Sequence, residues 1–518
     1  MAWCAASASG TLPPIREGGT LRVNDSSDHN ETLDPGVNYI TSGWAIFYAT
    51  CAKLVNYPDA GQPASSTVVP EVATALPAVS DSGRQYTFTI RPGFEFNTGE
   101  AVTAASFATA INRDLSPQLR SPAVAFLQDV VGADEVIAGK AATASGVVAS
   151  GDTLTIRLTA PAPDFVTRLS MPFFCAVPAS LPATDQGYTP VPMAGPYYIA
   201  SATPNGEIVL KPNPNYGGSR SRHLAEIDVN QNTDPVASML AIGHGGADYD
   251  IGNLDTTLLR SYQARGKLGT AQFSIHPDLE LHYVVFNLRR LVFRDVRLRK
   301  AVNLALDRRR VLAVSGLYGK PTGQILPPAM PGYRYAAIYP LDGPNLAAAR
   351  RLVAGRHLTV NFFIPADPIS FALASEVADE LQRIGITVNV QDFTNSATIQ
   401  TAPWDLAVYD WTADYPDPYD FINAMLYGAT ADIQGSQNFG GFRSAAFDAR
   451  MMAAASLSGA ARWAAYAKLD ADLMRTAAPI APIADVYEPQ LVSHRVRADC
   501  QTYPKQVAFL DLATTCLR

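Results

Sequence analysis

The sequence lacks the short motifs that mark most nucleotide-binding and hydrolytic sites. It contains no Gly-x-x-x-x-Gly-Lys-Ser/Thr, no Gly-x-Gly-x-x-Gly after a predicted strand, no His-Glu-x-x-His and no Gly-x-Ser-x-Gly. The seven histidines are scattered along the chain and show no metal-ligand spacing. In a chain of 518 residues, these absences favour binding over catalysis.

Charge and long hydrophobic runs are also scarce. Charged residues make up 17% of the chain and the formal net charge is -7. No run of about 18 apolar residues occurs, so no transmembrane helix is predicted. The acidic balance predicts no general attraction to nucleic acid. Nine lysines and arginines lie between Arg289 and Arg310, and we interpret them as a solvated helix face rather than a nucleic-acid surface.

The first residues lack the charged and apolar regions of a complete signal peptide. Cys4 is followed by Ala-Ala-Ser-Ala-Ser-Gly, a small-residue tract like the one that follows the lipidated cysteine of a mature bacterial lipoprotein. We therefore expect residues 1–15 to form a flexible tether, with a lipid anchor at Cys4. The alternative is that Cys4 is a leftover cysteine with no such role.

The other four cysteines contain no Cys-x-x-Cys pair, which leaves a zinc or thioredoxin-type site without support. An even number of cysteines in an exported protein favours disulfides. We predict a bond between Cys500 and Cys516, which would close a short C-terminal loop, and a long-range bond between Cys51 and Cys175. Four buried free thiols are the alternative.

The length predicts two or three domains, because one hydrophobic core does not extend over 518 residues. Strands are expected over residues 358–364 and 386–390, and a helix over residues 371–384 between them. This β-α-β order predicts a parallel α/β unit in the second half of the chain.

Two further segments have clear local signals. Residues 86–90 alternate aromatic or aliphatic side chains with threonine, as a half-buried strand does, and Thr103 is a suitable N-cap for the helix that follows. Asp295 is a suitable N-cap for a single amphipathic helix expected over residues 296–314.

The stretch from Trp404 to Phe421 carries the clearest sign of a binding site. Residues 406–409 are typical of a buried strand, whereas Pro416 and Pro418 exclude regular structure from the second half. Aromatic walls with a few charges suit a small cationic or zwitterionic ligand, and the spacing is not that of a calcium loop. The alternative is an acidic surface loop over tucked-in aromatics. The stretch contains these acidic and aromatic residues: Asp410, Asp414, Asp417, Asp420, Trp411, Tyr415 and Tyr419.

Several segments share their order and spacing with one known family. They are Gly18–Val23 with Leu33-Asp34-Pro35, Tyr86–Gly99 with Val102-Thr103-Ala104, Gly195-Pro196-Tyr197, Lys211–Tyr216, and Phe286-Asn287 with Phe293–Arg308. Through these segments nearly the whole chain resembles the family 5 extracellular solute-binding proteins of ABC importers, the dipeptide, oligopeptide and nickel class.

The resemblance implies an α/β fold of two lobes that close over the ligand around a hinge, with a small subdomain inserted in the first lobe. Mapped onto this chain, residues 16–58, 188–275 and 485–518 would form lobe I. Residues 59–187 would form the insert, and residues 276–484 would form lobe II.

The resemblance also implies a site. In peptide-binding relatives, an aspartate in a loop after a tryptophan accepts the ligand's α-ammonium group. The segment Trp411-Thr412-Ala413-Asp414 resembles that loop, which gives Asp414 this role. Trp411 and Tyr415 would form pocket walls. The full set of ligand-binding candidates is Asp414, Trp411, Tyr415, Asp417, Trp44, Tyr39, Asn438 and Phe439.

The chain departs from the peptide binders because no assignable arginine near this loop would clamp a ligand carboxylate. Nickel is a less expected ligand, because no histidine lies near the loop in the sequence. An oligosaccharide or another small solute is the alternative ligand, with the aromatics stacking on it. An enzyme on this scaffold would need a nucleophile and a base that the sequence does not reveal.

The resemblance implies a bacterial protein outside the cytoplasm, in the periplasm or at the cell surface, that works as a monomer without a cofactor or metal. Its partners would be the peptide or small-molecule ligand and the permease subunits of an ABC importer. Nucleic acid is not expected as a partner, and a membrane is expected only through an anchor at Cys4.

Overall fold

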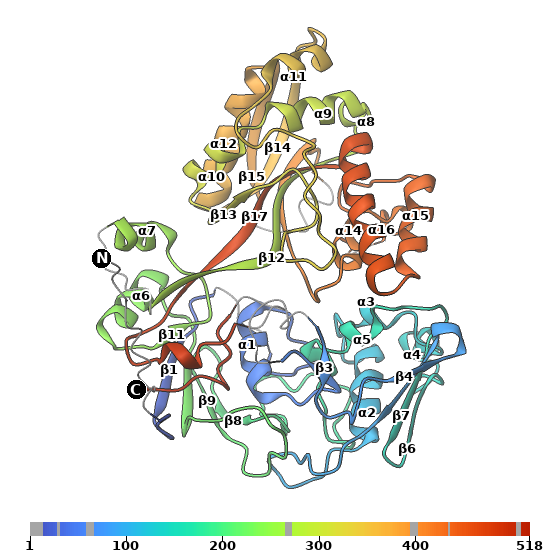
Figure 1. The fold of residues 1–518 in the computed structure, drawn as a ribbon, viewed down its shortest axis with the longest axis vertical. Coiled ribbons are helices and arrows are strands. Elements are labelled where there is room, and N and C mark those ends of the chain that lie inside the picture. The colour runs from blue at the N-terminus through green and yellow to red at the C-terminus, as the bar shows by residue number, and fades with distance from the viewer. Residues whose placement is uncertain are drawn as a thin grey trace, which may run out of the picture.

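The computed structural model describes residues 14–27, 32–58, 67–264, 272–393, 402–433, 436–503 and 509–518. Two α/β lobes are stacked along the long axis of the molecule, as Figure 1 shows. The lower lobe in that view holds the first half of the chain and the C-terminal end, and the upper lobe holds the residues between them. The predicted two-lobed α/β fold is confirmed.

Lobe I is built on a five-stranded mixed sheet. Its strands are β1 (Thr20–Asn24), β8 (Tyr197–Ala202), β9 (Glu207–Pro212), β10 (Glu226–Asn230) and β11 (Tyr249–Asp250), and its helices are α1 (Thr41–Thr50), α6 (Pro235–His244) and α7 (Thr256–Ala264). The order is β11-β1-β10-β9-β8, with β1 parallel to β10 and β11 and the other pairs antiparallel. Leu21 and Val23 anchor β1 in the core, because both side chains are fully buried.

The insert is a four-stranded antiparallel sheet with short helices against it. Its strands are β4 (Ala78–Ser80), β5 (Gln85–Thr89), β6 (Val147–Ser150) and β7 (Thr153–Arg157), and its helices are α2 (Ala104–Leu115), α3 (Val124–Leu127), α4 (Ala133–Ile137) and α5 (Phe165–Arg168). The strand order is β4-β5-β7-β6. Tyr86 and Phe88 of β5 are buried, as their alternation predicts, and Thr103 forms a capping box with Ser106 at the start of α2. A separate pair, β2 (Val55–Asn56) and β3 (Val69–Pro70), precedes this sheet.

Lobe II is built on a six-stranded mixed sheet. Its strands are β12 (Phe273–Phe286), β13 (Gly319–Pro321), β14 (Leu358–Pro365), β15 (Ile386–Phe393), β16 (Leu406–Thr412) and β17 (Ile480–Leu491). Its helices are α8 (Leu291–Arg294), α9 (Val296–Ala305), α10 (Arg308–Ser315), α11 (Leu346–Val353), α12 (Pro368–Gln382), α14 (Tyr419–Leu426), α15 (Ala445–Ala455) and α16 (Gly459–Asp472). The order is β13-β17-β12-β16-β14-β15, and the parallel pair β14 and β15 flanks α12 as the predicted β-α-β unit.

The single helix expected over residues 296–314 is wrong. The chain forms α9 and α10 instead, separated by the extended residue Leu306. The reason is a second N-cap residue, Asp307, which the helical spacing of the apolar residues does not indicate. The Asp307 side chain accepts a hydrogen bond of 3.2 Å from the backbone N–H of Arg310 and so starts a new helix.

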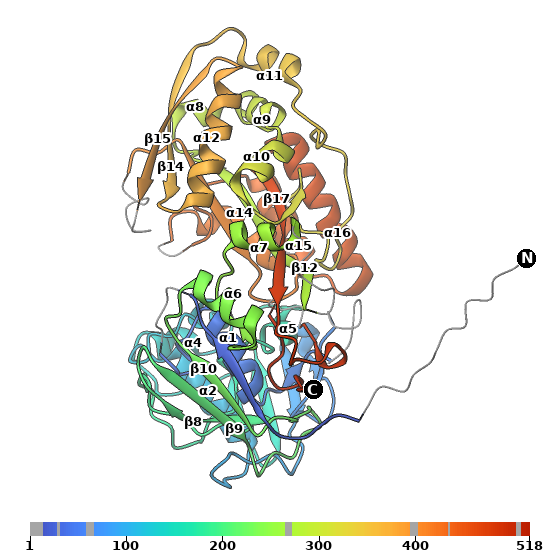
Figure 2. The ribbon, with the colours of Figure 1, turned by 90° about the vertical axis from the view of Figure 1, so that its left-hand side faces the viewer.

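Two antiparallel strands, β12 and β17, connect the lobes, as the views in Figures 1 and 2 agree. Their lobe II ends lie in that lobe's core, where Ile483 is fully buried. At the other end, Leu491 of β17 packs against Met239 of helix α6 in lobe I. The domain boundaries predicted after residues 275 and 484 fall inside these two strands, and they stay a prediction.

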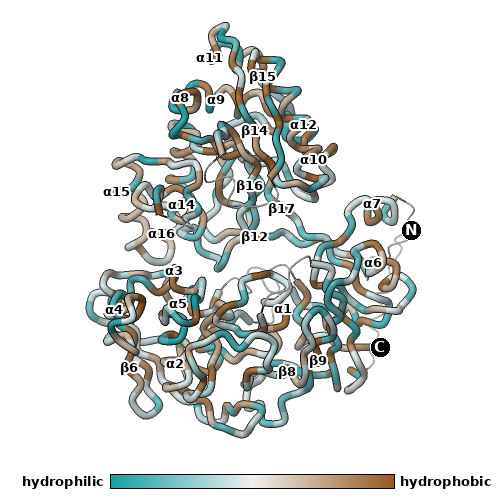
Figure 3. The backbone as a smooth tube through the Cα atoms, turned by 180° about the vertical axis from the view of Figure 1, so that it is seen from behind, coloured by the Kyte–Doolittle hydropathy of each residue, from teal (hydrophilic) through white to brown (hydrophobic). Residues whose placement is uncertain are grey.

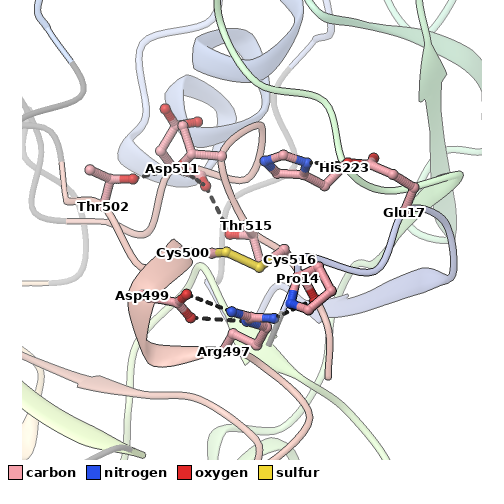
Figure 4. The surroundings of a disulfide bond; sticks show 11 residues. Pro14, Glu17, His223, Arg497, Asp499, Cys500, Thr502, Asp511, Thr515 and Cys516 are labelled. Atoms are coloured by element: carbon pink, nitrogen blue, oxygen red, sulfur yellow. Dashed lines mark hydrogen bonds and ion pairs between the residues drawn. A yellow bond between two sulfur atoms is a disulfide. The ribbon is translucent and has the colours of Figure 1, made fainter. Parts of the chain in front are cut away.

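Two disulfides tie the lower lobe together. The structure pairs Cys51 with Cys175, at a Cα–Cα distance of 5.4 Å, and Cys500 with Cys516, at 5.6 Å. This is the pairing that the sequence analysis expects. Figure 4 shows the second bond beside the ion pair of Arg497 with Asp499. Among the described residues, no helix has the length and apolarity to cross a membrane.

Candidate functional site

The candidate loop begins where β16 ends. β16 pairs with β12 on one side and β14 on the other, so its backbone is fixed at the middle of the lobe II sheet. The strand predicted over residues 406–409 is confirmed and extends to Thr412. Residues 413–418 form no helix or strand, as the two prolines predict, but α14 begins at Tyr419, earlier than the sequence suggests. Pro418 occupies the N-cap position of that helix.

A pocket of about 340 Å³ lies between the lobes, where the end of β16 meets the start of α1. Both lobes supply its walls, so its shape depends on how closely they approach. Its lining residues are Tyr39, Ile40, Thr41, Trp44, Tyr409, Asp410, Trp411, Thr412, Ala413, Asp414 and Gln437. Among the described residues that line it, two are acidic and none is basic.

Asp414 makes a direct contact between the two lobes inside this pocket. Its Oδ1 accepts a hydrogen bond of 2.5 Å from the Tyr39 hydroxyl of lobe I. Its backbone N–H donates to Asp420 Oδ2 at 2.7 Å, which fixes the loop against α14. Burial raises the pKa of Asp414 to about 7, although the hydrogen bonds from Tyr39 and Asp420 oppose the shift. A carboxyl with this pKa changes charge readily when a cation approaches.

Aromatic side chains from both lobes surround Asp414. The Trp411 indole N–H donates to the backbone carbonyl of Asp420 at 2.7 Å, so the ring has a fixed orientation. From lobe I, the rings of Tyr39 and Trp44 lie 5.8 Å apart, and both pack on Phe173 of the insert at 5.4 Å and 5.5 Å. The predicted residues Asp414, Trp411, Trp44 and Tyr39 are therefore brought together in one pocket.

The predicted wall residue Tyr415 does not line this pocket. Its side chain leaves lobe II and is 1% exposed, packed edge-on against Phe126 at a ring distance of 6.3 Å. Its hydroxyl donates a hydrogen bond of 2.9 Å to Asp164 of the insert. The Tyr415 side chain therefore reaches across the boundary between the lobes, away from the pocket, and its role in ligand binding stays a prediction. Figure 3 shows α14 and α16 of lobe II opposite α3 and α5 of the insert at this boundary.

Asp417, Asn438 and Phe439 also lie outside the pocket lining. Asp417 forms a buried bidentate ion pair with Arg462, at 2.7 and 3.0 Å, which anchors the loop to α16. The Asn438 side-chain amide forms hydrogen bonds with the backbone of residues 427 and 442 and so stabilises its own loop. Phe439 stacks on Tyr409 at 4.4 Å, so it supports a pocket wall from behind.

Sequence reasoning missed several residues of the site. Ile40, Thr41 and Gln437 give no signal, because nothing in their local sequence indicates that they face lobe II. No histidine lies near the loop in the sequence, but strand pairing brings one close in space, since it sets His282 of β12 opposite Asp410 of β16. The two residues come from strands far apart in the sequence, so only the sheet register could reveal the contact.

His282 forms part of a compact polar cluster at the edge of the site. Its Nε2 lies 2.7 Å from Glu280 Oε1, and Glu280 Oε2 accepts a hydrogen bond of 3.1 Å from Thr412. One ligand atom each from Glu280, His282 and Asp410 can be chosen so that all three lie within 4.8 Å of one another. Asp410 also lines the pocket, so the cluster and the pocket share a residue.

Curated relatives match the chain over most of its length. It is 28% identical over 451 residues to the periplasmic oligopeptide-binding protein OppA of Escherichia coli, covering 79% of this chain and 78% of OppA. It is 26% identical over 517 residues to the periplasmic murein peptide-binding protein MppA of the same organism, covering 94% and 91%. A further relative, the probable deoxycholate-binding periplasmic protein YgiS of E. coli, is 26% identical over 502 residues, covering 92% and 89%.

Solved structures share the fold. The clavulanic acid biosynthesis oligopeptide binding protein 2 superposes with a TM-score of 0.89 at 23% identity, covering 98% of this chain and 96% of that one. The unliganded open form of MppA superposes with a TM-score of 0.77, covering 97% and 98%. The sequence profile described as bacterial extracellular solute-binding proteins, family 5 Middle, matches residues 67–432. The chain therefore belongs to the family 5 bacterial extracellular solute-binding proteins.

Proposed function

We propose that this chain captures a peptide with a free α-ammonium group between its two lobes, and that Asp414 accepts that group. The observation that carries the proposal is a buried carboxylate in the wall of an interlobe pocket whose described lining contains no basic side chain. A charge-assisted hydrogen bond of this kind contributes about 1.5–3 kcal/mol. Three relatives with peptide-binding names, OppA, MppA and the probable D,D-dipeptide-binding protein DdpA of E. coli, support the ligand class.

The charge of the pocket favours cationic and zwitterionic ligands over anionic ones. Asp410 and Asp414 both face the pocket, and a negatively charged ligand would meet them without a counter-charge among the described lining residues. A bile acid such as deoxycholate is an anion, so the relative named for that compound is a poor guide to this pocket. The sequence also predicts no arginine that would clamp a ligand carboxylate, which is consistent with a pocket that disfavours anions.

Binding would be coupled to closure of the lobes about β12 and β17. Two hydrogen bonds, from Tyr39 to Asp414 and from Tyr415 to Asp164, cross the boundary between the lobes, and we assign them to the closed arrangement. In an open arrangement these groups would face water, and the ligand would enter there. Small-angle scattering that stayed unchanged on saturation with a binding peptide would contradict this coupling.

The chain would act outside the cytoplasm as a monomer and deliver its ligand to the permease subunits of an ABC importer. It would release the ligand unchanged, as a binding protein and not an enzyme. Anchoring through Cys4 remains part of the proposal, and that residue lies outside the described residues. Recovery of an intact peptide after long incubation would support binding without turnover.

The test is isothermal titration calorimetry with one short peptide in two forms, with a free and with an acetylated N-terminus. The wild type is expected to prefer the free form by about 10- to 100-fold, which corresponds to roughly 1.4–2.8 kcal/mol. Asp414→Asn should remove that preference. Asp342→Asn, at an exposed ion pair of lobe II, is the matched control and should keep it. Equal affinity of the wild type for both forms would exclude the ammonium anchor, and binding of oligosaccharides alone would favour the sugar alternative.

A further inference from the structure

The pairing of β12 with β16 builds a second polar site beside the pocket. The register sets Glu280 opposite Thr412 and His282 opposite Asp410. Residues two apart on a strand point to the same face, so the Glu280, His282 and Asp410 side chains gather on one face of the sheet. One ligand atom from each lies within 4.8 Å of the others. These three side chains are called the β12–β16 cluster below.

Hydrogen bonds already hold two members of the β12–β16 cluster in place. Glu280 accepts from Thr412 through one oxygen and contacts His282 Nε2 through the other, and both the Glu280 and His282 side chains are only 17% exposed. Pre-positioned ligands lower the cost of binding an ion, because little conformational freedom is lost when it arrives.

The imidazole has a second ring nitrogen that Glu280 does not engage. His282 Nδ1 is buried and has no hydrogen-bond partner among the described residues. A buried polar atom without a partner destabilises the fold, so its presence calls for an explanation. The charge balance is also incomplete. Within the described parts of the chain, His282 is the sole ion-pair partner of Glu280, and Asp410 has none.

We propose that the β12–β16 cluster binds a divalent transition-metal ion such as Zn²⁺. One imidazole nitrogen and two carboxylate oxygens are ligands that Zn²⁺ takes up readily, and three protein ligands leave at least one coordination position for another group. Because Asp410 also lines the pocket, that free position is accessible from the ligand side. The inference does not depend on the identity of the organic ligand.

The competing explanation is that His282 carries a proton and simply forms an ion pair with Glu280. The two explanations differ in whether the metal-free protein takes up Zn²⁺ tightly. Protein stripped with a chelator and titrated with ZnCl₂ in a calorimeter is expected to bind one ion with a dissociation constant of roughly 10 µM or below, about −7 kcal/mol. Binding no tighter than about 1 mM would overturn the proposal.

Variants locate the ion. His282→Ala removes one ligand, and Glu280→Gln keeps the shape of the side chain and its acceptor for Thr412 while removing the charge. Each should weaken Zn²⁺ binding by at least about tenfold, near 1.4 kcal/mol. His357→Ala, at an exposed histidine of the same lobe, is the matched control. If both cluster variants bind Zn²⁺ like the wild type, the ion binds elsewhere and the assignment is wrong. An unchanged melting temperature of Glu280→Gln would exclude misfolding as the cause of its weaker Zn²⁺ binding.

Discussion

The Tyr39 hydroxyl of lobe I donates a 2.5 Å hydrogen bond to Asp414 Oδ1 of lobe II. The residue that resembles the ammonium anchor of peptide binders is thus engaged by the opposite lobe. A carboxylate has four acceptor positions, so Asp414 can receive an ammonium group while Tyr39 keeps its bond. With the proposed role of Asp414, this contact would link ligand capture to lobe closure through a single side chain.

The proposed role of Asp414 predicts that ligand binding depends on pH. Its pKa is raised to about 7, first by burial, and the two groups that face it are Tyr39 and the carboxyl of Asp420, whose pKa burial also raises. A raised carboxyl pKa means that Asp414 holds a proton below about pH 7 before a ligand binds. An ammonium group needs the carboxylate, so binding expels that proton and affinity falls as the pH falls.

Between pH 7.5 and 5.5, the affinity for a free-amine peptide is expected to drop by about 25-fold, since each proton expelled changes the binding constant by up to tenfold per pH unit. The peptide ammonium stays largely charged over this range. Calorimetry at both pH values measures the change. Asp414→Asn should bind weakly at both values without the slope. A wild-type affinity that did not vary with pH would show that Asp414 is ionised before the ligand arrives.

A substitution at Tyr415 tests lobe closure without changing the pocket lining. Its hydroxyl donates to Asp164, which is buried and also paired with Arg168 at 2.8 Å. Tyr415→Phe removes one hydrogen bond to a buried carboxylate and should destabilise the closed state by about 1–3 kcal/mol. Peptide affinity should therefore fall by about 5- to 150-fold. Tyr335→Phe, at an exposed tyrosine, should have no effect, and an unaltered affinity of Tyr415→Phe would mean that this contact does not accompany binding.

Local chemistry predicted much of the site, and tertiary contacts decided the rest. The strand before the loop and the irregular segment after it followed from buried aliphatic residues and from Pro416 and Pro418. The position of the Tyr415 side chain could not be predicted, because Asp164, which accepts the hydrogen bond from its hydroxyl, lies in the insert. The same limit concealed His282, which reaches Asp410 only through the register of β12 and β16.

The two disulfides should differ in their effect on stability. The bond between Cys51 and Cys175 spans 124 residues, and the bond between Cys500 and Cys516 spans 16. Loop-closure entropy predicts losses of about 5 and about 3 kcal/mol when they are removed. Cys51→Ala with Cys175→Ala should therefore lower the urea midpoint further than Cys500→Ala with Cys516→Ala. A reversed order would indicate that local packing, and not the unfolded chain, sets the difference.

The metal proposal and the peptide proposal together predict a coupling between the two ligands. The described pocket lining has two carboxylates and no basic side chain that would hold a peptide's C-terminal carboxylate. A Zn²⁺ ion on Asp410 would neutralise one of those charges and offer a positive charge with a free coordination position. Short peptides with a free C-terminus should therefore gain affinity over their C-terminal amides when Zn²⁺ is present, by about tenfold, or 1.4 kcal/mol.

Calorimetry of one dipeptide and its amide, in chelator and in Zn²⁺, measures this coupling. The ratio of the two affinities should rise with Zn²⁺ in the wild type and in His357→Ala, and stay constant in His282→Ala. By linkage, the free-acid dipeptide should tighten Zn²⁺ binding by the same factor. If the protein binds Zn²⁺ but the ratio of dipeptide to amide affinity does not change, the two sites are not coupled. The ion would then lie too far from the peptide carboxylate to attract it.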